Sequence, residues 1–273
     1  MQNFKEWYKT LSGTTLAARR QIPGLPSDRA DLIIAGSSII KALADKCKAR
    51  KMIISGCGLR EGLFSQYLHE KSQRPLIIPD ILEAARENMV HLYAPDIAHC
   101  RLVERYATQL FHAWKGFHHL DEKRWLPLLQ TAALLHDTGI TINFYNHTRH
   151  SGYLIENGKL FGLSHLDIAY TAIIAAWHHG VTRSYLRNRP YRKLIPETDM
   201  KRLGTCALLL AVAECLDYTQ TGVVQKIQAE ISNGEALLTL TASQSPAVEL
   251  QQLQMRSKWF RKCLGCNLSI VVE

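Results

Sequence analysis

A histidine and an aspartate stand side by side at His136 and Asp137, directly after the apolar run at residues 132–135. The run is helical in type, and Thr138 and Gly139 follow the pair as a turn. Two adjacent ligands at a helix end can converge on one ion, because the chain bends there. By itself the pair is a weak signal, since most His-Asp dipeptides are surface or capping residues. It predicts a metal site only if further ligands face the same core.

Two more histidines are expected to face that core. Asp96 is predicted to cap a helix that carries His99 on one face with four apolar residues, Leu102, Val103, Tyr106 and Leu110. A lone inward histidine is usually an ordinary core residue, but this one points to the same core as His136. His150 shares its helical face with Tyr153 and Leu154, so it is expected to point inward too.

Paired histidines and two carboxylates complete the set of candidate ligands. Ser164 begins a helix that ends at His178 and His179, where the alternative role of a histidine is to compensate the helix dipole. A later apolar helix carries Glu214 and Asp217 on its buried stripe. Buried carboxylates are costly unless a positive group meets them, and an ion would be such a group.

The composition indicates an intracellular protein with anionic partners. The 273 residues are 47% hydrophobic, and the net charge of +9 favours polyanionic partners: nucleic acid, polyphosphate, nucleotides or an acidic membrane surface. Seven cysteines scattered through apolar segments do not form a disulfide framework, which favours a reducing cytoplasm. No signal peptide or membrane span is expected. No helix-turn-helix, RNP or zinc-finger pattern appears, which argues against a nucleic-acid partner.

The order of the elements predicts a mainly α protein with small α/β parts. A helix at 29–46, a strand at Lys51–Ser55, a glycine turn at 56–58 and a helix from Leu59 to about Leu68 make a fragment of an α/β layer. A polar linker follows to Pro75, and helices continue to about residue 220. The remainder, with an Asn233-Gly234 hairpin turn, is predicted to be a β-β-α-β unit.

The ligand order H…HD…H…H…(D/E) resembles the HD superfamily of metal-dependent phosphohydrolases. The resemblance implies an HD-type helical bundle that holds one or two divalent ions, Mn²⁺, Fe²⁺, Zn²⁺ or Mg²⁺. One ion is expected to bind His99, His136, Asp137 and either Glu214 or Asp217. A second is expected to bind His150 and His178, with His179 as a further candidate ligand and Asp137 bridging the two ions. Glu214 matches the superfamily's last aspartate, but Asp217 is an equally good ligand chemically, so both remain candidates.

Five segments resemble the exopolyphosphatase/guanosine-pentaphosphate phosphatase (Ppx/GppA) family: RADLIIAGSSIIKAL, SGCGLREGLF, AALLHDTGI, RHSGYLI and LLLAVAECLD. In that family the catalytic site lies in two N-terminal actin-like domains, which precede an HD-like helical domain and a small α/β domain. The resemblance implies an actin-like remnant at 1–75, the HD-type domain at 76–220 and the small domain at 221–273. The D-x-G-S and D-x-G-G-G phosphate loops are missing from this sequence, so activity is expected in the helical domain.

The leading hypothesis is therefore a metal-dependent phosphohydrolase that acts on a nucleotide or another phosphorylated anion through a metal-activated water. Asp137, His150 and Arg149 are the predicted catalytic residues, and Arg149, Arg183 and Arg187 are predicted to bind substrate phosphates. The alternative is a non-catalytic polyphosphate-binding or regulatory subunit that complements a separate actin-like partner. The incomplete α/β fragment favours this alternative or self-association as a homo-oligomer, because a half-sheet needs a neighbour.

Overall fold

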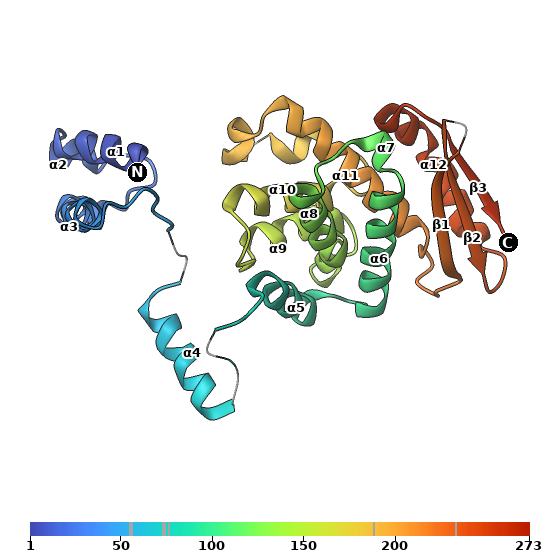
Figure 1. Cartoon of the computed structure of the whole chain (residues 1–273), viewed down its shortest axis with the longest axis horizontal. Coiled ribbons are helices and arrows are strands. Elements are labelled where there is room, and N and C mark those ends of the chain that lie inside the picture. The colour runs from blue at the N-terminus through green and yellow to red at the C-terminus, as the bar shows by residue number, and fades with distance from the viewer. Residues whose placement is uncertain (55–56, 73–74, 76, 188, 233) are drawn as a thin grey trace. The chain divides into compact units, whose positions relative to one another are not determined.

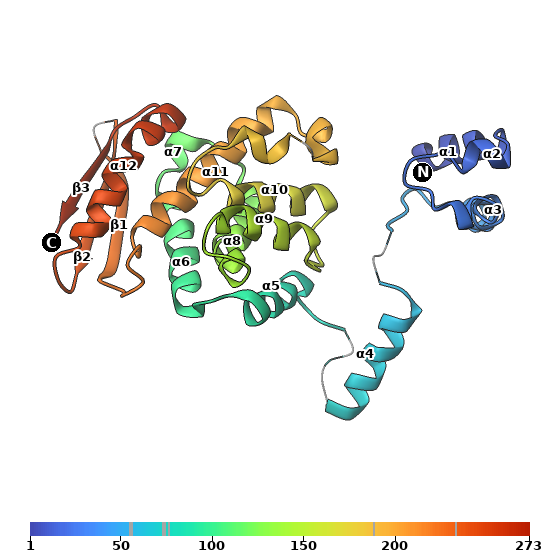
Figure 2. The same ribbon diagram turned by 180° about the vertical axis from the view of Figure 1, so that it is seen from behind.

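The structure is a computed structural model that describes residues 1–54, 57–72, 75, 77–187, 189–232 and 234–273. Its internal contacts divide the chain into two compact units, Met1–Ile77 and Ile78–Glu273. Figures 1 and 2 show the two units from opposite sides. In the described part of the chain, no helix combines the length and apolar character needed to cross a bilayer.

The first unit is helical in its described residues. Its elements are α1 (Gln2–Ser12), α2 (Leu16–Arg19), the 3-10 turn η1 (Ser27–Arg29), α3 (Ile33–Lys46) and α4 (Leu59–Ser72). Arg19 is buried and its Nε donates to the Ala30 carbonyl at 2.9 Å, which ties α2 to the segment before α3. The helix predicted at 29–46 is confirmed as α3, which begins at Ile33 rather than at Arg29 and ends at Lys46 as predicted.

Two predictions for this unit need correction. Residues 51–54 of the predicted strand have no regular structure, and Ile53 and Ile54 are exposed. An apolar run forms a strand only where another strand pairs with its backbone, and the described residues of this unit supply none. The helix predicted to end near Leu68 continues to Ser72 and takes up part of the predicted linker. Ser55, the end of the predicted strand, and Gly56, the first residue of the predicted glycine turn, lie outside the described residues.

The second unit begins with a helical layer, as the periodicity predicted. Side chains of Asp80, Asp96, Asp121 and Ser164 accept hydrogen bonds from the first turns of four helices, which explains where these helices begin. The α-helices of this layer are α5 (Ile81–Tyr93), α6 (Ile97–Ala113), α7 (Lys115–His118), α8 (Glu122–Leu135), α9 (His147–Asn157), α10 (His165–Ala176) and α11 (Glu197–Cys215). Helix α8 packs against α5, α6, α10 and α11, as Figure 1 shows.

A three-stranded sheet with one helix closes the second unit. Strands β1 (Val224–Ser232) and β2 (Glu235–Ala242) are antiparallel, and α12 (Ala247–Leu264) leads to β3 (Leu268–Val272), which pairs parallel to β2. The predicted β-β-α-β order is confirmed. Gly234 has a φ of 77° in the predicted hairpin turn, whereas Asn233 lies outside the described residues. Figure 2 shows α12 between this sheet and α11.

The helical layer and the sheet share one hydrophobic core. Trp114, at the end of α6, meets Phe260 of α12 edge to face with ring centroids 5.2 Å apart. Deeper in the layer, Trp125 of α8 stacks on Tyr170 of α10 at 5.6 Å. Such aromatic pairs bury large areas and fix the relative positions of their helices. Residues 221–273 belong to the same compact unit as the helices and share their core. Their predicted division into a separate small domain stays a prediction.

Candidate metal site

The chain bends sharply after α8, and the bend places Asp137 beside the start of α9. The backbone N–H of Gly139 donates to Ser151 Oγ at 2.8 Å. A Cβ atom on Gly139 would lie 2.2 Å from the carbonyl oxygen of His147, so only glycine lets α9 pack this closely. Asn146 adopts a left-handed conformation, with a φ of 60°, immediately before α9. The first residue of α9, His147, is thereby brought next to Asp137.

Asp137 lies among three imidazole rings and is only 5% exposed. Its Oδ1 is 3.6 Å from His136 Nε2 and 3.5 Å from His147 Nε2. Its Oδ2 is 3.8 Å from His99 Nε2. These separations are too long for hydrogen bonds. Two ligand atoms bound to one ion at about 2.1 Å stand roughly 3.0–3.4 Å apart, so the arrangement is close to that of a metal site.

The ring orientations of three histidines are fixed by backbone carbonyl groups. Nδ1 of His136 lies 2.7 Å from the Ala133 oxygen, Nδ1 of His178 lies 2.6 Å from the Ala175 oxygen, and Nδ1 of His147 lies 3.0 Å from the Phe144 oxygen. A carbonyl oxygen can only accept, so each Nδ1 carries the proton. In the neutral ring, Nε2 then carries no proton and keeps its lone pair, which is the form that binds a metal.

The histidines and carboxylates around Asp137 are called the histidine cluster below: His99, His136, Asp137, His147, His178, His179, Glu214 and Asp217. Three of its buried polar atoms have no hydrogen-bond partner within the described residues: His136 Nε2, His178 Nε2 and Glu214 Oε2. A buried acceptor without a partner costs roughly 1–3 kcal/mol. Such acceptors call for nearby positive charge, and imidazole nitrogens and carboxylate oxygens are suitable ligands for divalent cations. The donor set therefore fits a divalent metal.

Asp217 and Glu214 have different positions in the cluster. Asp217 Oδ2 is 2.8 Å from His99 Nδ1, and its Oδ1 accepts from the backbone N–H of Gly222 at 2.9 Å. Both oxygens of Asp217 are thus engaged, and its carboxylate orients His99 in the way that carboxylates orient metal-binding histidines. Glu214 Oε1 meets His179 Nε2 at 3.0 Å, which leaves Oε2 free at 4.0 Å from His178 Nε2. The geometry favours Glu214 as the ligand.

Burial and neighbouring charges shift the pKa values of these histidines in opposite directions. Burial, together with the charge of His179, holds the pKa of His178 well below its usual value, so the ring is neutral. Burial also disfavours the charged form of His99, but the Asp217 hydrogen bond and the Asp137 charge outweigh it and raise the pKa of His99. Glu214 raises the pKa of His179 against burial in the same way. The neighbouring carboxylates thus favour the charged forms of His99 and His179, whereas burial favours the neutral form of His178.

Among the described residues, the atoms that could share an ion form two groups, His99 with His136 and Asp137, and His147 with His178 and His179. The first group contains three of the predicted ligands. In the second group His147 stands where His150 was predicted. His150 is half-buried and its Cβ lies over Gly139, so it belongs to neither group. The apolar pattern after His150 thus pointed to a residue that lies outside both groups. The nearness of His147 to the bend after Asp137 was the signal that favoured His147.

The predicted phosphate-binding arginines do not lie together. Arg149 is exposed and donates to Ser184 Oγ at 2.7 Å. Arg187 is exposed and, like Arg149, lines neither the large groove beside His179 nor the smaller cavity at the histidine cluster. Arg183 lines a groove of about 1120 Å³ that also contains His179. Of the three, only Arg183 shares a cavity with a candidate metal ligand.

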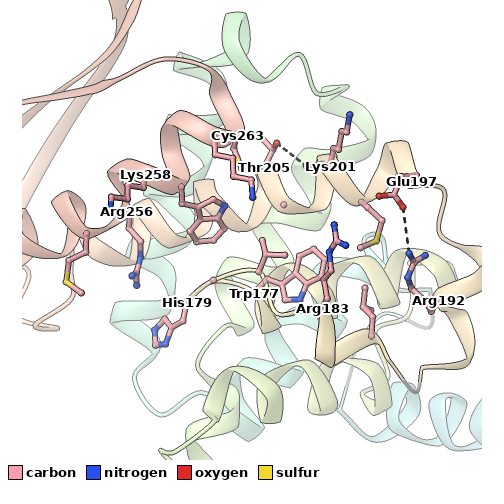
Figure 3. A pocket seen from close by; sticks show the side chains of 18 residues that line it. Trp177, His179, Arg183, Arg192, Glu197, Lys201, Thr205, Arg256, Lys258 and Cys263 are labelled. Carbon is pink, nitrogen blue, oxygen red and sulfur yellow. Dashed lines mark hydrogen bonds and ion pairs between the residues drawn. The ribbon is translucent and has the colours of Figure 1, made fainter.

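The groove is strongly basic, and its second wall comes from α12, a helix in which the sequence suggested no chemistry. Its Lys and Arg residues are Arg183, Arg192, Lys201, Arg256, Lys258 and Lys262. Glu197 is the acidic side chain among its described lining residues and lies 3.7 Å from Arg192. In Figure 3, His179 and Arg256 lie toward one end of the groove and Arg192 with Glu197 toward the other. The exposed basic residues of α12 were the missed signal.

Comparisons with known proteins identify the family. Residues 81–257, more than half of the chain, match the family model described as Ppx/GppA phosphatase, domain III, and residues 1–71 match that of the Ppx/GppA phosphatase family. Two similar curated proteins are both named guanosine-5'-triphosphate,3'-diphosphate pyrophosphatase. The one from Vibrio cholerae serotype O1 is 29% identical over 220 residues, which are 81% of this chain and 42% of the relative.

The second, from Vibrio campbellii, is 27% identical over 252 residues, which are 92% of this chain and 48% of the relative. The chain thus spans about half the length of the curated relatives it matches. The matched residues run through α4 and from α5 into α12, so they include every element that contributes to the histidine cluster. The chain belongs to the Ppx/GppA phosphatase family.

Proposed function

We propose that the second unit is a metal-dependent phosphohydrolase of HD type that acts on a nucleotide or another phosphorylated anion. One observation carries the proposal: three atoms without a partner among the described residues, His136 Nε2, His178 Nε2 and Glu214 Oε2, lie in the buried cluster around Asp137. The pyrophosphatase names of the relatives support phosphate chemistry.

The residues of the cluster have distinct roles in this proposal. Asp137 is the central carboxylate, because its two oxygens face histidines of both ligand groups. Asp217 orients His99, and Glu214 adds a second carboxylate on the side of His178. A divalent ion bound there would activate a water for attack on phosphorus and neutralise phosphoryl charge. Arg183, which shares the groove with His179, would hold a substrate phosphate through its forked N–H groups.

Elemental analysis tests the proposal directly. The purified full chain, reconstituted with Mn²⁺, Fe²⁺ or Zn²⁺ and then dialysed, is expected to retain one or two equivalents of divalent metal, because buried imidazole and carboxylate ligands release ions slowly. An exposed-histidine variant, His112→Ala, serves as the control and is expected to retain the same amount. Dialysed protein without any of these metals would exclude the proposed mechanism.

The basic groove favours a second function, the binding of polyphosphate without hydrolysis. Six Lys and Arg residues against one carboxylate, which is itself paired, create a positive surface suited to a chain of phosphates. Lys258 and Lys262 are exposed on α12, so reversing their charge alters the groove and leaves the core intact. The groove thus allows a test that does not depend on the metal cluster.

The variant Lys258→Glu Lys262→Glu is expected to bind long-chain polyphosphate more weakly and with a shallower salt dependence. Each lost phosphate contact lowers the slope of log K against log salt by roughly 0.7. The control is Lys123→Glu Lys226→Glu, which changes the net charge equally at exposed sites outside the groove. Binding would be measured by titration of the metal-free protein at several salt concentrations. Equal losses in the two variants would indicate diffuse charge rather than a groove.

A further inference from the structure

A second, smaller cavity opens directly onto the histidine cluster. Its volume is about 270 Å³, and five of its lining residues belong to the cluster: His99, Asp137, His147, His179 and Glu214. The other five form its rim: Ile140, Phe144, Tyr218, Thr219 and Gln220. A ligand whose phosphate reaches the cluster through this opening therefore places its remaining atoms against these rim residues.

The rim differs chemically from the basic groove. Within the described residues, the lining of this cavity includes neither lysine nor arginine. A chain of phosphates that entered here would meet no cationic side chain beyond the cluster, and unpaired phosphates next to protein are costly. The rim therefore selects a ligand whose part outside the cluster is uncharged.

Two exposed aromatic rings give the rim its character. Phe144 is 67% exposed and Tyr218 is 42% exposed, although both are large enough to be core residues. The Phe144 ring lies 5.8 Å from the His147 ring, and Tyr218 follows Asp217 directly in the chain. Both rings therefore flank the cluster itself. Planar rings stack favourably on exposed aromatic side chains, which makes this rim a surface for an aromatic ring.

The segment that carries Tyr218 is held in a fixed conformation. The backbone N–H and the hydroxyl of Thr219 donate to Glu249 Oε1 at 3.2 and 2.6 Å, and Glu249 is 2% exposed within α12. Gln220 adopts a left-handed conformation with a φ of 55°, which costs free energy and persists only where neighbouring contacts impose it. A rim that is already ordered loses little entropy when a ligand stacks on it.

We propose that this cavity selects phosphate monoesters that carry an uncharged aromatic ring, of the nucleoside monophosphate class, with the ring against Tyr218 and Phe144. The inference rests on the proposed function, since the phosphate is assigned to the histidine cluster. It separates the two cavities by ligand: the rim receives the ring of a monophosphate, whereas the basic groove is the surface proposed above for chains of phosphates.

The test compares adenosine 5'-monophosphate with ribose 5-phosphate, which carries the same phosphate ester without the ring. Dissociation constants for the metal-reconstituted full chain would be measured by calorimetry. We expect the parent to bind the nucleotide more tightly, and Tyr218→Leu to reduce this preference roughly fivefold to 150-fold, the range of one base-aromatic stack. Tyr218→Phe keeps the ring and is expected to keep the preference. Tyr145→Leu is the matched control, because Tyr145 is 79% exposed and does not line the cavity.

The outcomes separate this inference from the proposed function. Equal or undetectable binding of the two compounds by the parent, or an unchanged preference in Tyr218→Leu, overturns the inference whatever the metal content. Retained metal with hydrolysis of both compounds at equal rates leaves the phosphohydrolase proposal standing and removes the ring-selective rim. Loss of the preference in Tyr145→Leu as well would show that the loss does not depend on the Tyr218 ring, and would contradict the assignment to Tyr218.

Discussion

The variant His136→Ala Asp137→Ala is expected to lose phosphatase activity by roughly a thousandfold or more, because a metal contributes several kcal/mol to transition-state stabilisation in such sites. The substitutions remove the carboxylate that lies between the two ligand groups and one of the two unpartnered nitrogens. The measurement is the rate of hydrolysis of adenosine 5'-monophosphate and p-nitrophenyl phosphate by the metal-reconstituted protein, together with its metal content.

The neighbouring histidines of α9 provide the matched comparison for this prediction. His147→Ala is expected to follow the double variant, since its Nε2 lies 3.5 Å from Asp137. His150→Ala is expected to change the rate only a few-fold, because His150 belongs to neither ligand group. Full activity in the double variant, or a larger loss in His150→Ala than in His147→Ala, would refute the arrangement. Circular dichroism of each variant would show whether it folds.

Substitution of Glu214, in the last turn of α11, and of Asp217, two residues after α11 ends, is expected to weaken metal binding to different extents. Asp217 acts on His99 through a hydrogen bond, and removal of such an orienting partner typically lowers metal affinity about 10–100-fold. Glu214 presents an unpartnered oxygen to the site, so Glu214→Gln is expected to lower the affinity by more than about a hundredfold. Competition with a chromogenic chelator would give both dissociation constants.

This comparison decides a question that the sequence left open. A larger loss in Asp217→Asn than in Glu214→Gln would make Asp217 the ligand and Glu214 the orienting residue. The control is Glu197→Gln, in the first turn of the same helix and far along it from the cluster, with a side chain that is 73% exposed. Equal affinities in all three variants would place the metal away from α11 altogether.

Helix positions in the second unit were predicted well because local rules govern them. The side chain of Asp96 caps α6 as predicted, and His99 lies on the buried face, as the spacing of its apolar neighbours required. The Ser164 cap of α10 and the order of elements after residue 223 were confirmed for the same reason. Periodicity failed where pairing is not local, as at residues 51–54, which have no strand to pair with in the described part of their unit.

The choice between His147 and His150 shows the limit of helical periodicity. The two residues are about one turn apart, and the apolar residues Tyr153 and Leu154 predicted that His150 faces inward. The decision depends on Gly139, whose missing Cβ lets α9 approach the bend after Asp137. That approach is a contact between segments, and the spacing within one helix does not encode it.

The sequence by itself determined the residue types of the candidate site, the helices that carry most of them and the excess of positive charge, because each follows from composition or from periodicity within one segment. Tertiary structure alone decided which nitrogen and oxygen atoms are left without partners, that Asp217 orients His99, and that α12 supplies a basic wall and Glu249 a tie to the rim. The physical reason is the sequence separation of the interacting residues. Hydrogen bonds and unpaired buried atoms depend on how separate helices pack, and that packing depends on contacts throughout the unit.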